Sequence, residues 1–173
     1  MIGMCSRSHI ASLQRRLARE ERGAALVEFA FLLPILLLLF AVIFDGGRMM
    51  WSYQTAISGV RDATRYLART APLDMCQAGY SGPAIGSHAA TLQAIVQNSI
   101  QGNTLFPGGI TVNSVTPTLN CVTGTFRISP TPVAQVQANM TITFLFSGIF
   151  SFVGSPQPSI TTTVTDQSRV FGV

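Results

Sequence analysis

The chain has 173 residues, of which 47% are hydrophobic and only 10% are charged, and its formal net charge is +4. Typical soluble domains carry about 25% charged residues, so this composition argues against an ordinary cytosolic protein. The length corresponds to a single domain of ordinary size.

The positive charge is concentrated in a basic leader at residues 1–23. Five arginines and two glutamates lie there, so the leader contributes 5 − 2 = +3 of the total of +4. No basic patch remains in the rest of the chain, which argues against a nucleic-acid partner. Arginines before a first hydrophobic segment favour a cytoplasmic N-terminus and place the C-terminal bulk on the other side of the membrane.

Residues 24–44 form an apolar run in which Glu28 is the only charged residue. About 20 apolar residues span the hydrocarbon core of a bilayer, so this run predicts a transmembrane helix. A signal peptide would have a shorter core of about 7–15 residues followed by small residues at the cleavage site. Phe44 and Asp45 interrupt any such pattern here, so cleavage on the outer side is not expected.

The transmembrane helix is expected to continue as an amphipathic stalk helix over residues 45–71. One face of this helix is defined by residues that recur every three or four positions: Met49, Tyr53, Ile57, Val60, Thr64 and Leu67. This period is typical of an α-helix with one covered face. Arg61, Arg65 and Arg69 lie on another face, which is typical of a solvated or headgroup-facing stripe rather than of a ligand site.

Residues 72–173 are predicted to form an extracytoplasmic α+β head. A turn-rich loop over 72–88 and a short helix precede segments with a period of two residues, which predict antiparallel strands. These strands are expected at 110–115, 119–128, 133–146 and 159–170, bounded by Pro117, Pro130 and Pro158. The stalk helix is expected to cover one face of the sheet. The apolar stretch 144–154 is either a core strand ending in a buried loop or a surface for a subunit or the membrane.

The predicted membrane span separates the three cysteines: Cys5 lies in the leader, and Cys76 and Cys121 lie beyond the membrane. An oxidising compartment permits Cys76 to pair with Cys121, which would stabilise the head. The alternatives are two free thiols or bonds to other chains.

The segment "RGAALVEFAFLLPILLLLFAVIFDGGRMMWSYQTAISGVRDATRYLAR" resembles the N-terminal segment of the TadE-like family. Members of this family are minor pilins or pseudopilins of the tight-adherence (Flp, type IVb) pilus system of bacteria. The resemblance covers roughly residues 20–70 and depends on the order of Gly23, Glu28-Phe29, Pro34, Gly47-Arg48 and the segment 63–69. Related TadF-like or TadG-like proteins remain alternatives.

The resemblance implies that a prepilin peptidase cuts between Gly23 and Ala24. Glu28 and Phe29 would then serve peptidase recognition and assembly, and Gly23 is expected to interrupt the helix at the cut. The implied partners are membrane lipid, the prepilin peptidase, other pilin and minor pilin subunits, and the pilus assembly platform. The implied location is the bacterial inner membrane, with the head in the periplasm.

The sequence contains no phosphate-binding loop, HExxH or G-x-S-x-G motif, so no enzyme, cofactor or metal site is predicted. Two alternatives to a processed pilin remain. One is an unprocessed single-pass scaffold of the same secretion apparatus, and the other is a periplasmic binding module on a membrane stalk.

Overall fold

The computed structural model describes residues 21–99, 101–150, 154 and 158–172. Residues 1–20, which make up most of the predicted leader, lie outside the described residues. The chain divides into two compact units between Ile43 and Phe44. Helix α2 (Glu21–Thr70) contributes to both units.

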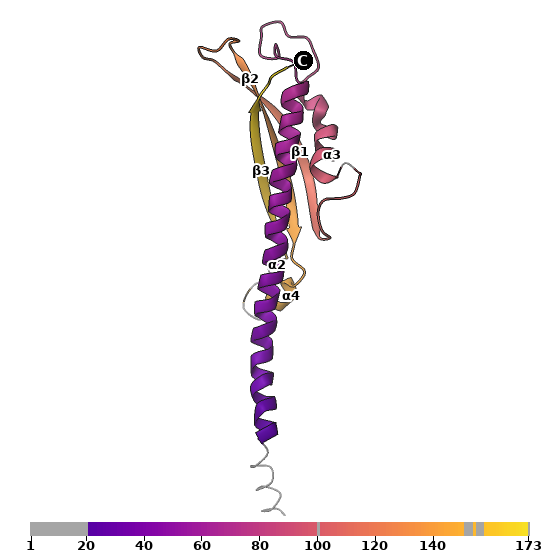
Figure 1. Cartoon of the computed structure of the whole chain (residues 1–173), viewed down its shortest axis with the longest axis vertical. Helices are drawn as coiled ribbons and strands as arrows, with labels where there is room; N and C mark the ends of the chain where they lie inside the picture. The colour runs from indigo at the N-terminus through magenta and orange to yellow at the C-terminus, as the bar shows by residue number, and fades with distance from the viewer. Residues whose placement is uncertain (1–20, 100, 151–153, 155–157, 173) are drawn as a thin grey trace, which may run out of the picture. The chain divides into compact units, whose positions relative to one another are not determined.

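The fold class is α+β, as the sequence predicted. In the C-terminal unit, α2 is followed by η1 (Ile85–His88), α3 (Ala89–Gln97), β1 (Ile110–Val122), β2 (Thr131–Thr143), α4 (Ser147–Phe150) and β3 (Ser159–Arg169). Within the described residues the strands form one antiparallel sheet in the order β1-β2-β3, so each strand pairs with the next one along the chain (Figure 1).

Strand β2 shows the alternation that its sequence predicts. From Ala134 to Ile142 every second residue is buried, namely Ala134, Val136, Ala138, Met140 and Ile142, and Thr131 and Pro132 at the start of the strand are buried as well. The intervening positions carry Gln, Asn and Thr side chains on the more accessible face, where Asn139 and Thr141 both hydrogen-bond to Asn113 of β1. One face of the sheet is therefore apolar and covered, and the other is polar.

Strand β1 differs from the prediction of two separate strands around Pro117. It is continuous from Ile110 to Val122, with Pro117 paired with Val136 and an irregularity between Val112 and Ser114. Proline cannot donate a backbone hydrogen bond, but an edge strand tolerates this loss because one of its sides has no strand partner. β1 is such an edge strand, so Pro117 does not end it.

The core packs α2 and α3 against the covered face of the sheet. The α2 residues in this core are Ala56, Val60, Ala63 and Leu67, and Ala71 directly after the helix joins them. The prediction that Met49 and Tyr53 continue this face was wrong, since both side chains are exposed. The smaller Ser52 and Ala56 are buried instead, because small side chains let the helix backbone approach its neighbours closely.

Gly59 shows how close this approach is. A Cβ atom at Gly59 would lie 3.1 Å from the carbonyl oxygen of Val96 and 3.2 Å from its Cα atom, which is tighter than ordinary van der Waals contact. Glycine therefore allows α3 to lie directly on α2.

Cys76 and Cys121 form a disulfide that links the loop after α2 to the end of β1. The two cysteines are 45 residues apart in the sequence, so the bond closes a long loop. In the chain-entropy description, closing a loop of this length stabilises the folded state by roughly 3–4 kcal/mol.

Replacing both cysteines, as Cys76→Ser with Cys121→Ser, is expected to lower the free energy of unfolding by about that amount, roughly 3–4 kcal/mol. Urea unfolding of the full chain in detergent, followed by circular dichroism, measures the change. Cys5→Ser is the matched control and should unfold at the midpoint of the unmodified chain. An unchanged midpoint in the double variant would contradict the prediction.

Candidate functional site

The predicted processing and assembly residues lie on the first turns of α2. Ala24, Glu28 and Phe29 are exposed, and Gly23 has no neighbouring group within 4 Å of a Cβ placed on it. Since α2 begins at Glu21, the expected interruption of the helix at Gly23 is not observed. One glycine costs a helix only about 1 kcal/mol relative to alanine, and the residues after it are strong helix formers.

Helical geometry places the backbone nitrogen of Ala24 and the side chain of Glu28 on one face. The two residues are four positions apart, which corresponds to about 6 Å along the helix axis. The ion pairs of the described side chains join Arg48 to Asp45 and Arg65 to Asp62, and none of them includes Glu28. Within the described part of the chain, this carboxylate therefore has no cation paired with it.

The N-terminal half of α2 exposes apolar side chains on every face. Leu26, Phe31, Ile35 and Ile43 are among the most exposed of them, and Pro34 lies within the helix. By length and composition, α2 is the one helix among the described residues that could cross a bilayer. Since apolar residues in such numbers are unfavourable in water, the helix indicates membrane anchoring.

Asp45, the first residue after this apolar run, is buried within the C-terminal unit, with only 3% of its surface exposed. Its carboxylate accepts hydrogen bonds from the backbone N–H groups of Leu145, at 3.3 Å, and Phe146, at 3.1 Å. It also pairs with the guanidinium group of Arg48 at 3.3 Å. A buried carboxylate is favourable only when it is paired and hydrogen-bonded in this way.

Two further contacts complete this arrangement, which we call the Asp45 tie. Arg48 donates a second hydrogen bond to the carbonyl oxygen of Gly108. The ring of Phe44 packs edge-on against that of Phe146, with centroids 5.6 Å apart. One turn of α2 thus holds the loop before β1 and the segment after β2.

Sequence reasoning missed the Asp45 tie and treated Asp45 only as the end of the apolar run. The available signal was an acidic residue directly after that run, with Arg48 three positions further on the same helix. Spacing alone predicts that these two side chains meet. It does not reveal the backbone N–H groups from a segment about one hundred residues later.

The variant Asp45→Asn is expected to lower the free energy of unfolding by about 2–4 kcal/mol. The side-chain amide would point its own N–H donors at the N–H of Phe146, and Arg48 would lose its counter-charge. Chemical unfolding of the full chain in detergent measures this loss.

Asp62→Asn is the matched control, because Asp62 is an exposed acid on the same helix whose pair with Arg65 spans 3.9 Å. Exposed pairs of this kind contribute less than about 1 kcal/mol. Equal unfolding midpoints for the two variants would mean that the Asp45 tie does not stabilise the fold.

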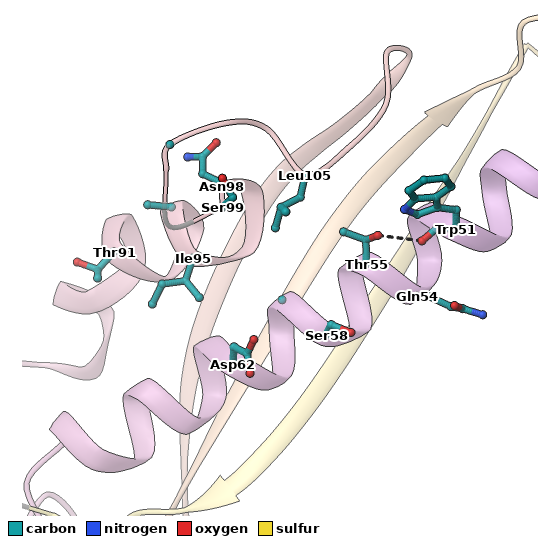
Figure 2. Close-up of a pocket in the computed structure, with 13 residues that line it drawn as sticks. Trp51, Gln54, Thr55, Ser58, Asp62, Thr91, Ile95, Asn98, Ser99 and Leu105 are labelled. Carbon is teal, nitrogen blue, oxygen red and sulfur yellow. Dashed lines mark hydrogen bonds between the residues drawn. The ribbon is translucent and has the colours of Figure 1, made fainter.

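The C-terminal unit also contains a groove of about 880 Å³ between α2 and the segment from α3 to Leu105 (Figure 2). Trp51 lies at one end of it, where the backbone oxygen of Trp51 accepts a hydrogen bond from Thr55. Asp62 is the one ionisable side chain in its lining. An acid without a base or nucleophile beside it does not form a catalytic set. Among the described residues, no three His, Cys, Asp or Glu side chains come together to hold a metal ion.

These observations define a class of protein, an α+β protein anchored to the membrane by an apolar N-terminal helix. The family model described as TadE-like protein matches residues 23–65, which makes this segment TadE-like and confirms the predicted resemblance. The match supports a protein associated with the Tad pilus. Neither the curated proteins nor the solved structures include a match to this chain.

Proposed function

We propose that this protein is a non-enzymatic minor pilin or pseudopilin of the tight-adherence pilus, made as a membrane precursor and assembled through its N-terminal helix. The observation that carries the proposal is the coincidence of two features. The TadE-like segment begins at Gly23, and the first half of this segment is an exposed apolar helix. Near its start it carries the acid Glu28, which has no ion pair among the described residues.

The first step of the proposed function is removal of residues 1–23 by a prepilin peptidase. Gly23 is the third residue of α2 and lies in its first turn, where a helix is most easily unwound. Its lack of a side chain lowers the cost of unwinding further and lets the peptidase approach the backbone. Cleavage also removes the five arginines that hold the N-terminus in the cytoplasm.

The second step is pairing between neighbouring helices. After cleavage Ala24 carries a free ammonium group, so each apolar helix presents a cation and the Glu28 carboxylate about 6 Å apart along its axis. An unpaired acid inside a membrane costs about 2.5–3.5 kcal/mol at the bilayer centre and less near the interface. Pairing Glu28 with the ammonium group of the next subunit removes this cost and fixes the axial offset between the two helices.

The proposed topology places the N-terminus in the cytoplasm, residues 24–44 in the inner membrane, the stalk 45–71 beyond it, and the head 72–173 in the periplasm. Phe29 would contribute to recognition by the peptidase. The partners would be the peptidase, other pilin and minor pilin subunits, and the pilus assembly platform.

N-terminal sequencing of the protein isolated from cells with active pilus assembly tests the proposal. The expected product begins at Ala24. A chain that retains the leader in those cells would favour the unprocessed membrane scaffold and would overturn the proposed processing.

A further inference from the structure

The charged residues of the C-terminal unit are distributed unequally along it. Residues 75–126 and 128–165 contain no Asp, Glu, Lys or Arg. The remaining charged residues fall in three groups. Asp45 and Arg48 lie at the start of the unit, Arg61, Asp62, Arg65, Arg69 and Asp74 lie in the second half of the stalk and the loop after it, and Arg127, Asp166 and Arg169 lie in the sheet and its connections.

Hydrogen bonds fix which end of the unit is which. The Asp45 tie holds the end of the sheet at which β1 begins and β2 ends. Asp45 is also the first residue after the apolar run, so this end of the sheet is the one near the predicted span. At the opposite end, the backbone N–H of Phe171 donates to the carbonyl oxygen of Ala68 at 2.8 Å. Arg127, in the connection between β1 and β2, and Arg169, at the last position of β3, belong to that opposite end.

We call the first of these ends the basal end and define it as residues 44–51, 105–109 and 144–148. It exposes large apolar side chains: Phe44 at 42%, Met50 at 58%, Trp51 at 70%, Leu105 at 38% and Leu145 at 60%. Phe44 and Trp51 are seven residues apart, so along α2 this band is about 10 Å high. That height is comparable to the interfacial layer of a bilayer, in which tryptophan is enriched.

The charges of the basal end are engaged within the protein. Asp45 and Arg48 are its only charged residues, and the Arg48 side chain is only 14% exposed. Its Nη1 donates to the Asp45 carboxylate and its Nη2 to the Gly108 carbonyl. The charge of Arg48 is therefore balanced by Asp45, and the basal end has no excess positive charge for a lipid phosphate. An apolar surface without net charge next to a membrane span fits lipid through burial of apolar side chains.

We infer that the basal end is a membrane-contacting surface that rests on the interface of the same bilayer that α2 anchors in. Leu145 inserts between the headgroups, and the Asp45 tie holds its backbone at the level where the apolar run ends. The charged opposite end faces water. Because no free cation takes part, the contact does not depend on anionic lipid. The inference uses only the membrane anchor and does not require cleavage at Gly23.

Depth-dependent fluorescence quenching of the full chain in phospholipid vesicles tests this inference. Trp51 is the only tryptophan, so Trp51→Phe provides a background into which single tryptophans are placed. Leu145→Trp reports on the basal end, and Phe126→Trp, at another exposed aromatic, reports on the opposite end. Leu37→Trp reports on the span. All four sites are exposed, so these changes leave the core intact.

We expect lipids carrying a nitroxide near the headgroup to quench the tryptophan at 145 several-fold more than the one at 126, and aqueous iodide to show the reverse order. The quenching at 145 should be the same in zwitterionic and anionic vesicles. Adding Asp45→Asn should reduce the lipid quenching at 145 while that at 37 stays unchanged.

Three results would overturn the inference. Lipid quenching at 145 no stronger than at 126, with full quenching at 37, would leave the anchor intact and the surface in water. Protection from iodide at 145 without lipid quenching would mean that another protein copy covers it. No lipid quenching at 37 would show that the N-terminal half of α2 does not enter the bilayer, and this result would overturn the inference as well. Since the precursor is used, none of these results depends on whether the leader is cleaved.

Discussion

In the variant Glu28→Gln, we expect the protein to insert into the membrane normally but to be lost from the assembled pilus complex. Glutamine has nearly the same shape as glutamate and is less costly in lipid, so insertion is retained. It carries no charge, so the ammonium group of the neighbouring Ala24 would be left without a counter-ion. Removing one partner of a buried pair costs about 3–5 kcal/mol, which corresponds to a loss of incorporation on the order of a hundredfold or more.

Crosslinking from position 28 in membranes, together with the amount of subunit in the isolated complex, measures this effect. Asp62→Asn removes one acid from the same helix at an exposed position and should assemble like the unmodified protein. Glu28→Asp keeps the charge on a shorter side chain and should retain part of the incorporation into the complex. Full incorporation of the Glu28→Gln variant would eliminate the pairing role of Glu28.

The second large effect is expected for Gly23→Leu, which should leave the chain uncut and held in the membrane by its leader. Leucine places a branched side chain where the peptidase must approach the backbone, and it also strengthens the helix that has to unwind. A misfit of this kind at a substrate position reduces cleavage by at least about tenfold. Because the arginines are retained, the subunit would also fail to leave the bilayer.

Mass spectrometry of the protein from membranes separates the precursor from a product that begins at Ala24. Gly46→Leu is the matched control, because Gly46 is a glycine of the same helix with no neighbouring group within 4 Å of a Cβ placed on it. It should be processed normally. Cleavage of the Gly23→Leu variant at an unchanged rate would show that the cut lies elsewhere or that this glycine plays no part in it.

The two variants distinguish the two steps of the proposed function. A chain that is cut but not assembled identifies the pairing step, and a chain that is neither cut nor assembled identifies the processing step. If the unmodified protein itself keeps its leader while pili form, both steps fail together and the scaffold is favoured. The inference about the basal end is independent of this outcome, since it concerns how the C-terminal unit meets lipid.

Much of the α+β fold follows from local patterns in the sequence. The apolar run at 24–44 and the two-residue alternation in β2 are signals of this kind, because each depends only on residues that are close together in the chain. The same holds for the TadE-like segment, whose order of glycine, acid and proline can be read without a structure. The pairing of Cys76 with Cys121 was also predicted, since the chain offers two cysteines beyond the span and an oxidising compartment favours their bond.

Where tertiary contacts decided the outcome, the local patterns gave the wrong answer. Met49 and Tyr53 fit the helical period but are exposed, because the close packing at Ser52, Ala56 and Gly59 favours small side chains over large ones. Pro117 looked like the end of a strand, and only its place on an edge strand allows β1 to pass through it.

By itself, the sequence determined that this protein has an apolar anchor with one acid near its start, an arginine-rich segment before it and an α+β unit after it. Only the tertiary structure decided that Asp45 ties α2 to Leu145 and Phe146, and that the basal end is apolar with its two charged residues paired to each other. The physical reason is the distance along the chain. Periodicity reports on neighbours within a few turns, whereas these contacts join residues about one hundred positions apart, and folding alone brings them together.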